Sequence, residues 1–116
     1  VLEKYRRLEN RLEKLEEDLY LSRPDIVLIV SPHGSYFADA FTINNHAEYR
    51  TDLKEFGDLT TKIKFKGEMN LTARIRERAR DQNFSAAMIS EQKLDHGAAV
   101  PLFYLTKHLP QIALIV

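Results

Sequence analysis

The sequence has no cysteine, which excludes disulfide scaffolds, thiolate zinc sites and cysteine nucleophiles. It has no excess charge of either sign, because 17 Lys and Arg residues balance 17 Asp and Glu residues. This balance removes the general electrostatic attraction to nucleic acid or to acidic membrane surfaces. Its longest wholly apolar runs, such as Ile26–Val30, are far too short to span a bilayer. No Gly-rich phosphate loop, nucleophile elbow or His-x-x-x-His pair occurs.

What is present fits a soluble globular domain. The 116 residues suffice for one domain with one core, and 44% hydrophobic with 29% charged residues argues against disorder. The first 23 residues are densely charged and show no signal peptide, so we expect a cytoplasmic protein. The chain opens at Val1 inside a helical pattern and stops in an apolar run, residues 112–116. We therefore expect residues 1–116 to be a single partial domain, excerpted from a longer protein.

An apolar stripe predicts a helix at the start of the chain. Its residues recur at spacings of three and four, at Leu2, Tyr5, Leu8, Leu12, Leu15 and Leu19. Pro24 ends this helix and pushes Arg23 out of the helical region. The stripe runs for under three heptads, so a helix packed on a sheet is favoured over a coiled coil. Pairing of this helix with a second copy of the chain is the alternative.

The rest of the chain alternates between strand and helix patterns. Ile26–Val30 and the stretch around Ala86–Ile89 are typical of strands buried on both faces, and Ile112–Val116 reads as a last strand. Lysines alternating with Ile63 and Phe65 indicate a half-exposed or edge strand. Helices are expected at residues 71–83, capped by Asn70, and 98–108, with Pro101 in the first turn. Residues 34–57 give little pattern beyond a turn at residues 44–46.

This order of elements predicts an α/β protein. A long helix that feeds an apolar strand, followed by two helices that can cross between strands, favours a layered fold. We expect a mostly parallel central sheet with helices packed on it. In such sheets, ligands bind at the carboxyl ends of the strands.

Two histidines follow predicted strands in that position. His33 lies in Ser31-Pro32-His33-Gly34 and His96 lies in Leu94-Asp95-His96-Gly97. If the two strands are parallel, both rings emerge at one rim, where imidazole suits metal ligation or proton transfer near neutral pH. The plainer interpretation is that each is a turn residue with its ring partly in solvent. Asp95 either orients His96 or caps the following helix.

Other candidates are weaker. Asp39 could reach the rim but also fits a solvated loop carboxylate, and Tyr36 and Phe37 could line a pocket or pack in the core. His46 is expected to be exposed in a turn, and His108 in the last turn of a helix, where its charge favours the dipole. Lys62, Lys64 and Lys66 are read as protection of a strand edge rather than a nucleic-acid patch.

At these two histidine motifs the chain resembles the B-subunit family of class III extradiol ring-cleavage dioxygenases. The stretches that carry the resemblance are Ile26–Gly34, Phe37–Phe41, Leu94–Gly97, Val100–Leu102 and Leu105. The Leu-Asp-His-Gly turn followed by an apolar Pro-Leu helix is the more specific of the motifs. The resemblance covers essentially the whole chain but only a middle stretch of the family's domain.

The resemblance implies an enzyme that opens the ring of a catechol-type aromatic diol with O₂ at non-haem Fe(II). His33 would be a metal ligand, and His96 would be a catalytic residue facing substrate and oxygen. The remaining ligands, another His and a Glu, and a further acid/base would lie outside this chain, so the excerpt should be inactive alone. A homo-oligomer and a small partner subunit are also implied. Imidazole and carboxylate suit Fe(II), which agrees with the absence of cysteine.

A second function remains open at this point. Memo-like proteins share this architecture without an established ring-cleavage role, so the fold alone does not decide the activity. In that alternative the chain is a metal-site or binding domain without ring cleavage.

Overall fold

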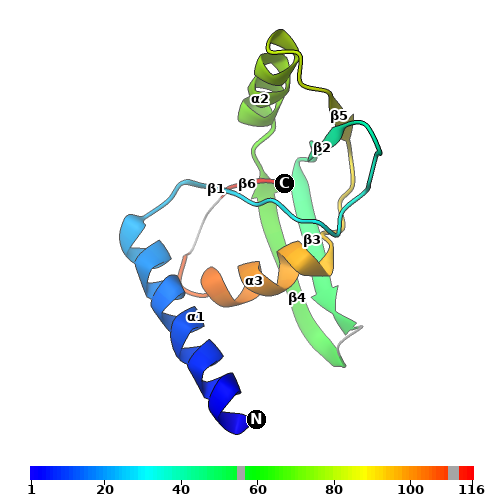
Figure 1. Cartoon of the computed structure of the whole chain (residues 1–116). Helices are drawn as coiled ribbons and strands as arrows, with labels where there is room; N and C mark the ends of the chain where they lie inside the picture. The colour runs from blue at the N-terminus through cyan, green and yellow to red at the C-terminus, as the bar shows by residue number, and fades with distance from the viewer. Residues whose placement is uncertain (55–56, 110–112) are drawn as a thin grey trace.

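The stripe at the start of the chain forms the long helix α1 (Leu2–Ser22), which ends where Arg23 takes a left-handed conformation before Pro24. The computed structural model describes residues 1–54, 57–109 and 113–116. The helix does not pack on a sheet as expected: its main contact is with α3 (His96–Leu105), and it projects from the rest of the molecule (Figure 1). Its apolar stripe is therefore mostly exposed: Leu2, Tyr5, Leu8 and Leu15 are more than half exposed, and Leu12 and Leu19 are partly covered.

The described strands form two small sheets rather than one central sheet. In the first, β1 (Ile26–Leu28), β6 (Ala113–Ile115), β4 (Asp58–Gly67) and β3 (Glu48–Leu53) lie in that order. The pairs β1–β6 and β4–β6 are parallel, and β3–β4 is antiparallel. The second sheet is the parallel pair β2 (Phe41–Asn44) and β5 (Ala86–Ile89). The α/β class is thus confirmed, and the expected layering around one central sheet is not established.

Two strand predictions fail on burial. β1 was expected to be buried on both faces, yet Leu28 is 58% exposed and Val30, just after it, 86%. The reason is its position at a sheet edge, where β6 pairs with one side only. β5 is likewise half-buried rather than buried, because β2 is its one strand partner within the described ranges. The last strand covers Ala113–Ile115, and residue 112 of the prediction lies outside the described residues.

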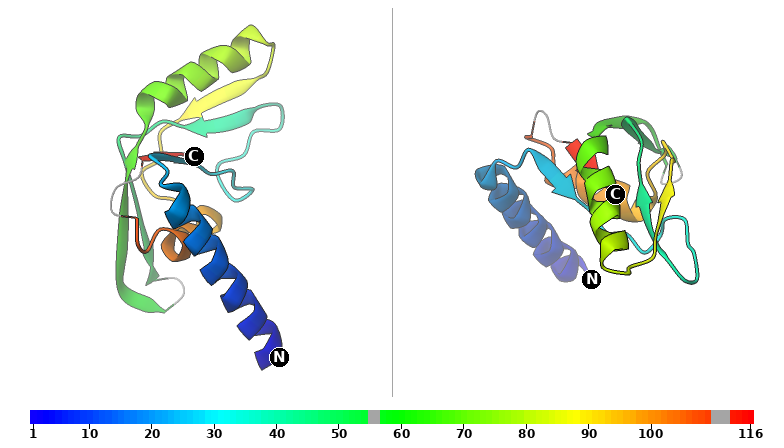
Figure 2. Two further views of the ribbon diagram at one scale, coloured as in Figure 1. Left: turned by 90° about the vertical axis from the view of Figure 1, so that its left-hand side faces the viewer. Right: turned by 90° about the horizontal axis from the view of Figure 1, so that it is seen from above.

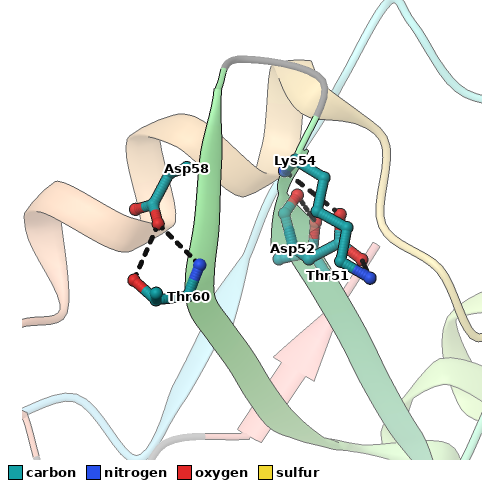
Figure 3. Close-up of polar contacts among 5 residues, drawn as sticks. All are labelled: Thr51, Asp52, Lys54, Asp58 and Thr60. Atoms are coloured by element: carbon teal, nitrogen blue, oxygen red, sulfur yellow. Dashed lines mark hydrogen bonds and ion pairs between the residues drawn. The ribbon is translucent and has the colours of Figure 1, made fainter.

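The segment without a clear pattern contains β2 and β3, which the sequence interpretation missed. β3 and β4 form the long hairpin of Figures 1 and 2. Its lysines do alternate with half-buried Ile63 and buried Phe65, but β4 is an interior strand, since β6 pairs with its last residues. At the far end of the hairpin, Asp58 accepts hydrogen bonds from the backbone and hydroxyl of Thr60, both 3.0 Å, and Asp52 accepts one from the backbone of Lys54 (Figure 3).

The two later helices start from carboxylate caps. Glu68, not the expected Asn70, caps α2 (Met69–Asp81) by accepting from the Leu71 backbone N–H. Asp95 caps α3, which begins earlier than expected and therefore holds Pro101 in its second turn rather than its first. α2 lies against β2 and β5, while α3 lies across the β3–β4 hairpin (Figure 2).

The core lies between α3 and that hairpin. Tyr49 and Phe65 of the hairpin pack with Leu94, Ala98, Ala99 and Leu102. The small residues Ala98 and Ala99 let α3 approach the sheet closely. Asp95 and His96 directly follow the buried Leu94 in the chain. Because Leu94 and Ala98 are anchored in the core, the turn between them is held in a defined position.

Candidate active site

The loop after β1 and the loop before α3 meet beside a cleft. His33 comes from the first loop and His96 opens α3, and their ring centroids lie 4.6 Å apart with an interplanar angle of 40°. Both residues are exposed, and both line one cleft of about 950 Å³. The two segments run side by side where the loop after β1 passes the start of α3 (Figure 1). The fold thus brings together the two histidines that the sequence motifs single out.

The cleft lining is mostly apolar, with a smaller set of polar side chains. Isoleucines from both sheets and from α2 line it, namely Ile29, Ile43, Ile75, Ile89 and Ile115. Its polar side chains come from the two loops and from β2, namely Ser31, Ser35, Thr42, Asn44, Glu91, Gln92, Lys93 and Asp95 beside the two histidines. Such a cavity suits a mostly apolar small molecule whose few polar groups are held at one side.

Asp95 joins the two histidine loops. Its Oδ1 accepts a hydrogen bond from Ser31 Oγ at 2.7 Å and one from the Ala98 backbone N–H at 3.1 Å. Ser31 Oγ in turn accepts from the backbone N–H of His33 at 3.2 Å. The capping interpretation of Asp95 is therefore confirmed, and the same carboxylate is also tied to the His33 loop.

Glu91 makes a second connection between the same loops, through a hydrogen bond from the Ser35 hydroxyl to its carboxylate. Its backbone is fixed by the buried Asn44, whose side chain donates to Glu91 O and accepts from Glu91 N, both at 2.9 Å. The hydroxyl of the buried Tyr49 donates to Asn44 O at 2.8 Å. Burial raises the pKa of this hydroxyl above its ordinary value, so it stays a donor.

The sequence interpretation missed Asn44 and Glu91, because their partners lie 47 and 56 residues away in the chain. Asn44 was assigned to a turn, and it is in fact the last residue of β2. An Asn at the end of an apolar stretch is a weak signal, since the same residue is common in turns.

The weaker candidates lie elsewhere. Asp39, Tyr36 and Phe37 are exposed and line a smaller hollow of about 480 Å³ behind the His33 loop, not the main cleft. His46 is half-buried rather than exposed, and its Nδ1 accepts from the Glu48 backbone N–H at 3.2 Å. His108 lies in the turn after α3, not in the last turn of the helix as expected, and it contacts Glu16 of α1.

The metal-donor chemistry of the site is incomplete within this chain. Two exposed imidazoles in one cleft are donors that suit Fe(II) in kind. In residues 1–54, 57–109 and 113–116, however, no group of three or more His, Cys, Asp or Glu side chains gathers where it could hold one ion. The described part of the chain can therefore contribute ligands to a metal but does not by itself surround one.

Residues 3–116 match the family described as the catalytic LigB subunit of aromatic ring-opening dioxygenase. The chain belongs to the LigB family. This family is the class III extradiol dioxygenase group that the histidine motifs resemble. The cleft lined by His33 and His96 therefore belongs to a LigB-family chain.

Two curated relatives are similar to this LigB-family chain. Protein CA_C1420 of Clostridium acetobutylicum is 25% identical over 122 residues, which cover 95% of this chain and 26% of that protein. The 4,5-DOPA dioxygenase extradiol of Mirabilis jalapa is 24% identical over 106 residues, which cover 90% of this chain and 40% of that protein. The chain thus spans less than half the length of either relative.

No helix in the described part of the chain is long and apolar enough to cross a membrane.

Proposed function

We propose that this chain is part of a non-haem Fe(II)-dependent extradiol dioxygenase that opens the ring of a catechol-type aromatic with O₂. The observation that carries the proposal is the pair of exposed histidines, 4.6 Å apart, at one cleft of a LigB-family chain. Similarity to a protein named as a 4,5-DOPA extradiol dioxygenase supports the aromatic diol as the substrate class.

In this proposal His33 is a metal ligand. Its ring is exposed to the cleft and its loop is tied to the β5–α3 loop, so the ring can meet an ion without first becoming ordered. The iron, when bound, keeps positions open for a diol and for O₂. The other ligands come from parts of the protein outside this chain, as the family resemblance implies, and the chain alone is expected to be inactive.

His96 is the catalytic residue of the proposal. A catechol loses protons as it binds, and negative charge then shifts from the diolate toward oxygen as oxygen attacks the ring. An imidazole beside the reacting atoms can accept or return a proton, or stabilise that charge by donating a hydrogen bond. The apolar cleft walls exclude water from the aromatic ring, which strengthens this electrostatic contribution.

The test uses the complete protein with a panel of catechols. Ferrous iron should be required for oxygen uptake and for the yellow ring-opened product. His33→Ala should abolish iron binding, measured as metal content after gel filtration, and His46→Ala should keep it, since His46 lies outside the cleft lining. Wild-type iron content in His33→Ala would refute the ligand assignment.

The Memo-like alternative makes a different prediction in the same experiment. A metal-site or binding domain would retain iron through His33 yet give no oxygen uptake with any catechol in the panel. That outcome would replace ring cleavage with binding as the function of the cleft.

The proposal also covers assembly and location. We propose that the complete protein forms a homo-oligomer, works with a small partner subunit and is cytoplasmic. The mostly exposed stripe of α1, which includes Leu8 and Leu15, offers a surface for a second copy. Sedimentation velocity of the complete protein with Leu8→Glu should give a lower mass than Arg6→Glu, which changes the opposite side of the helix. Equal masses would remove α1 as the interface.

A further inference from the structure

We propose that Asp95 and Gly97 are positioning residues for His33. Asp95 holds the backbone of the His33 turn through Ser31, and Gly97 leaves the space in which the His33 ring lies. This inference rests on the proposed function, in which His33 is a metal ligand. It differs from the expectation drawn from the sequence, in which Asp95 either orients His96 or caps a helix. The structure assigns the Asp95 carboxylate to the turn that carries the other histidine.

The carboxylate of Asp95 is bonded to that turn through Ser31. Its Oδ1 accepts from Ser31 Oγ, which itself accepts from the His33 backbone N–H, so a chain of two hydrogen bonds links carboxylate to histidine. Its Oδ2 lies 3.8 Å from the position of a Cβ atom on Gly34, on the other side of His33. The His33 turn is thus tied through Ser31 to one carboxylate, and the α3 cap fixes the position of that carboxylate.

Gly97 supplies the space in which the ring lies. A Cβ atom built on Gly97 would lie 2.5 Å from His33 Cδ2, 2.9 Å from Ser31 Oγ and 3.0 Å from Asp95 Oδ1. The first distance is far inside van der Waals contact, so a methyl group here forces the imidazole to move. Glycine at this position therefore determines where the His33 ring can lie, although its own backbone does not need a positive φ.

The chain contains a matched control for this effect. Gly34 is the residue after His33, just as Gly97 is the residue after His96. A Cβ atom on Gly34 would meet nothing closer than 3.8 Å, which is an ordinary contact. Gly34→Ala and Gly97→Ala thus add the same methyl group to equivalent positions of the two motifs, and only the second displaces the ring.

The experiment measures ring position and iron affinity separately, in the complete protein. In the metal-free form with labelled histidine, cross-relaxation between the His33 and His96 ring protons reports their proximity. Titration calorimetry with ferrous iron reports affinity. Wild type and Gly34→Ala should show the cross-peak and equal affinity, while Gly97→Ala should lose the cross-peak and bind iron at least tenfold more weakly.

Asp95 is tested by a conservative pair. Asp95→Asn keeps an oxygen that accepts from Ser31 and Ala98, so it should keep the cross-peak, whereas Asp95→Ala should lose it. This pair also decides the inference if Gly97→Ala does not fold. A cross-peak and iron affinity unchanged in both Gly97→Ala and Asp95→Ala would overturn it. Wild-type iron affinity in His33→Ala would instead refute the proposed function, and the cross-peaks would still decide the position of the ring.

Discussion

The rings of His33 and His96 lie 4.6 Å apart although 63 positions separate them in the chain, and both open onto the same cleft. One comes from an exposed loop after an edge strand, and the other from the first residue of a helix packed on the core. Because a loop carries one ring and a core-packed helix carries the other, we expect mutations around the two histidines to have different consequences.

His96→Gln should separate iron binding from turnover. Because the proposal makes His33 a ligand and His96 the proton-handling group, iron affinity should stay within about threefold of wild type while turnover falls roughly 10²- to 10⁴-fold. Calorimetry with ferrous iron and oxygen-electrode rates on one catechol measure the two effects. A parallel loss of iron would make His96 a ligand instead, and unchanged turnover would remove it from catalysis.

Asn44→Ala should destabilise the protein, while the same change at its neighbour Asn45 should cost less. The Asn44 side chain is buried and makes two hydrogen bonds to the backbone of Glu91, so its loss leaves those groups unpaired at a cost of about 1–3 kcal/mol. Asn45 Oδ1 is buried and accepts no hydrogen bond from the described residues. Urea unfolding of both variants checks the difference, and equal losses would contradict the assigned role of Asn44.

Tyr49→Phe should change the dependence of stability on alkaline pH. Burial raises the pKa of Tyr49 in the folded state, so its hydroxyl stays neutral while the unfolded tyrosine ionises near its ordinary value of about 10. The wild type is therefore fully stabilised by this group below pH about 10 and loses that contribution as pH rises toward the folded pKa.

The phenylalanine variant lacks the hydrogen bonds to Asn44 O and from His46 N, which costs about 1–2 kcal/mol at neutral pH. It has no group to ionise at this position, so it does not lose stability as the wild type does. The difference in unfolding free energy between wild type and variant should therefore shrink above pH about 10. Thermal unfolding of both proteins from pH 7 to 11 measures the gap. A gap that stays constant over this range would mean that the Tyr49 hydroxyl is not protected from ionisation.

Gly67→Ala should strongly destabilise the fold. A Cβ atom on Gly67 would overlap His46 O and lie 3.1 Å from the Tyr49 ring, and the first of these is a backbone atom that cannot rotate away. The expected loss is at least about 2 kcal/mol, against under about 0.5 kcal/mol for Gly34→Ala. Denaturant midpoints compare the two variants, and similar midpoints would show that the turn at His46 can shift freely.

Several elements followed from local pattern alone. The stripe of α1 and the stop at Pro24 gave a helix whose end, Ser22, the structure confirms. The alternation around Phe65 follows from local pattern for the same reason, and local pattern offers the Asp95 cap as one of two interpretations, because each depends on residues close together in the chain.

Other elements needed partners that are distant in sequence. β2 and β3 have no regular apolar pattern, and their strand conformation comes from pairing with β5 and β4. Burial of β1 was overestimated, because an apolar run does not say whether a strand lies at an edge. The same limit applies to α1, whose stripe indicates an apolar face but not that α3 is the element it contacts.

The amino-acid sequence determined which residues are the candidates for the chemistry: two His-Gly motifs after apolar stretches, with no cysteine to offer another kind of metal site. Only the tertiary structure decided that the two rings face each other, that Asp95 reaches Ser31, and that Gly97 leaves room for His33. The reason is physical. Residue type and local spacing set what a side chain can do, whereas a distance between two loops depends on how all the elements between them pack.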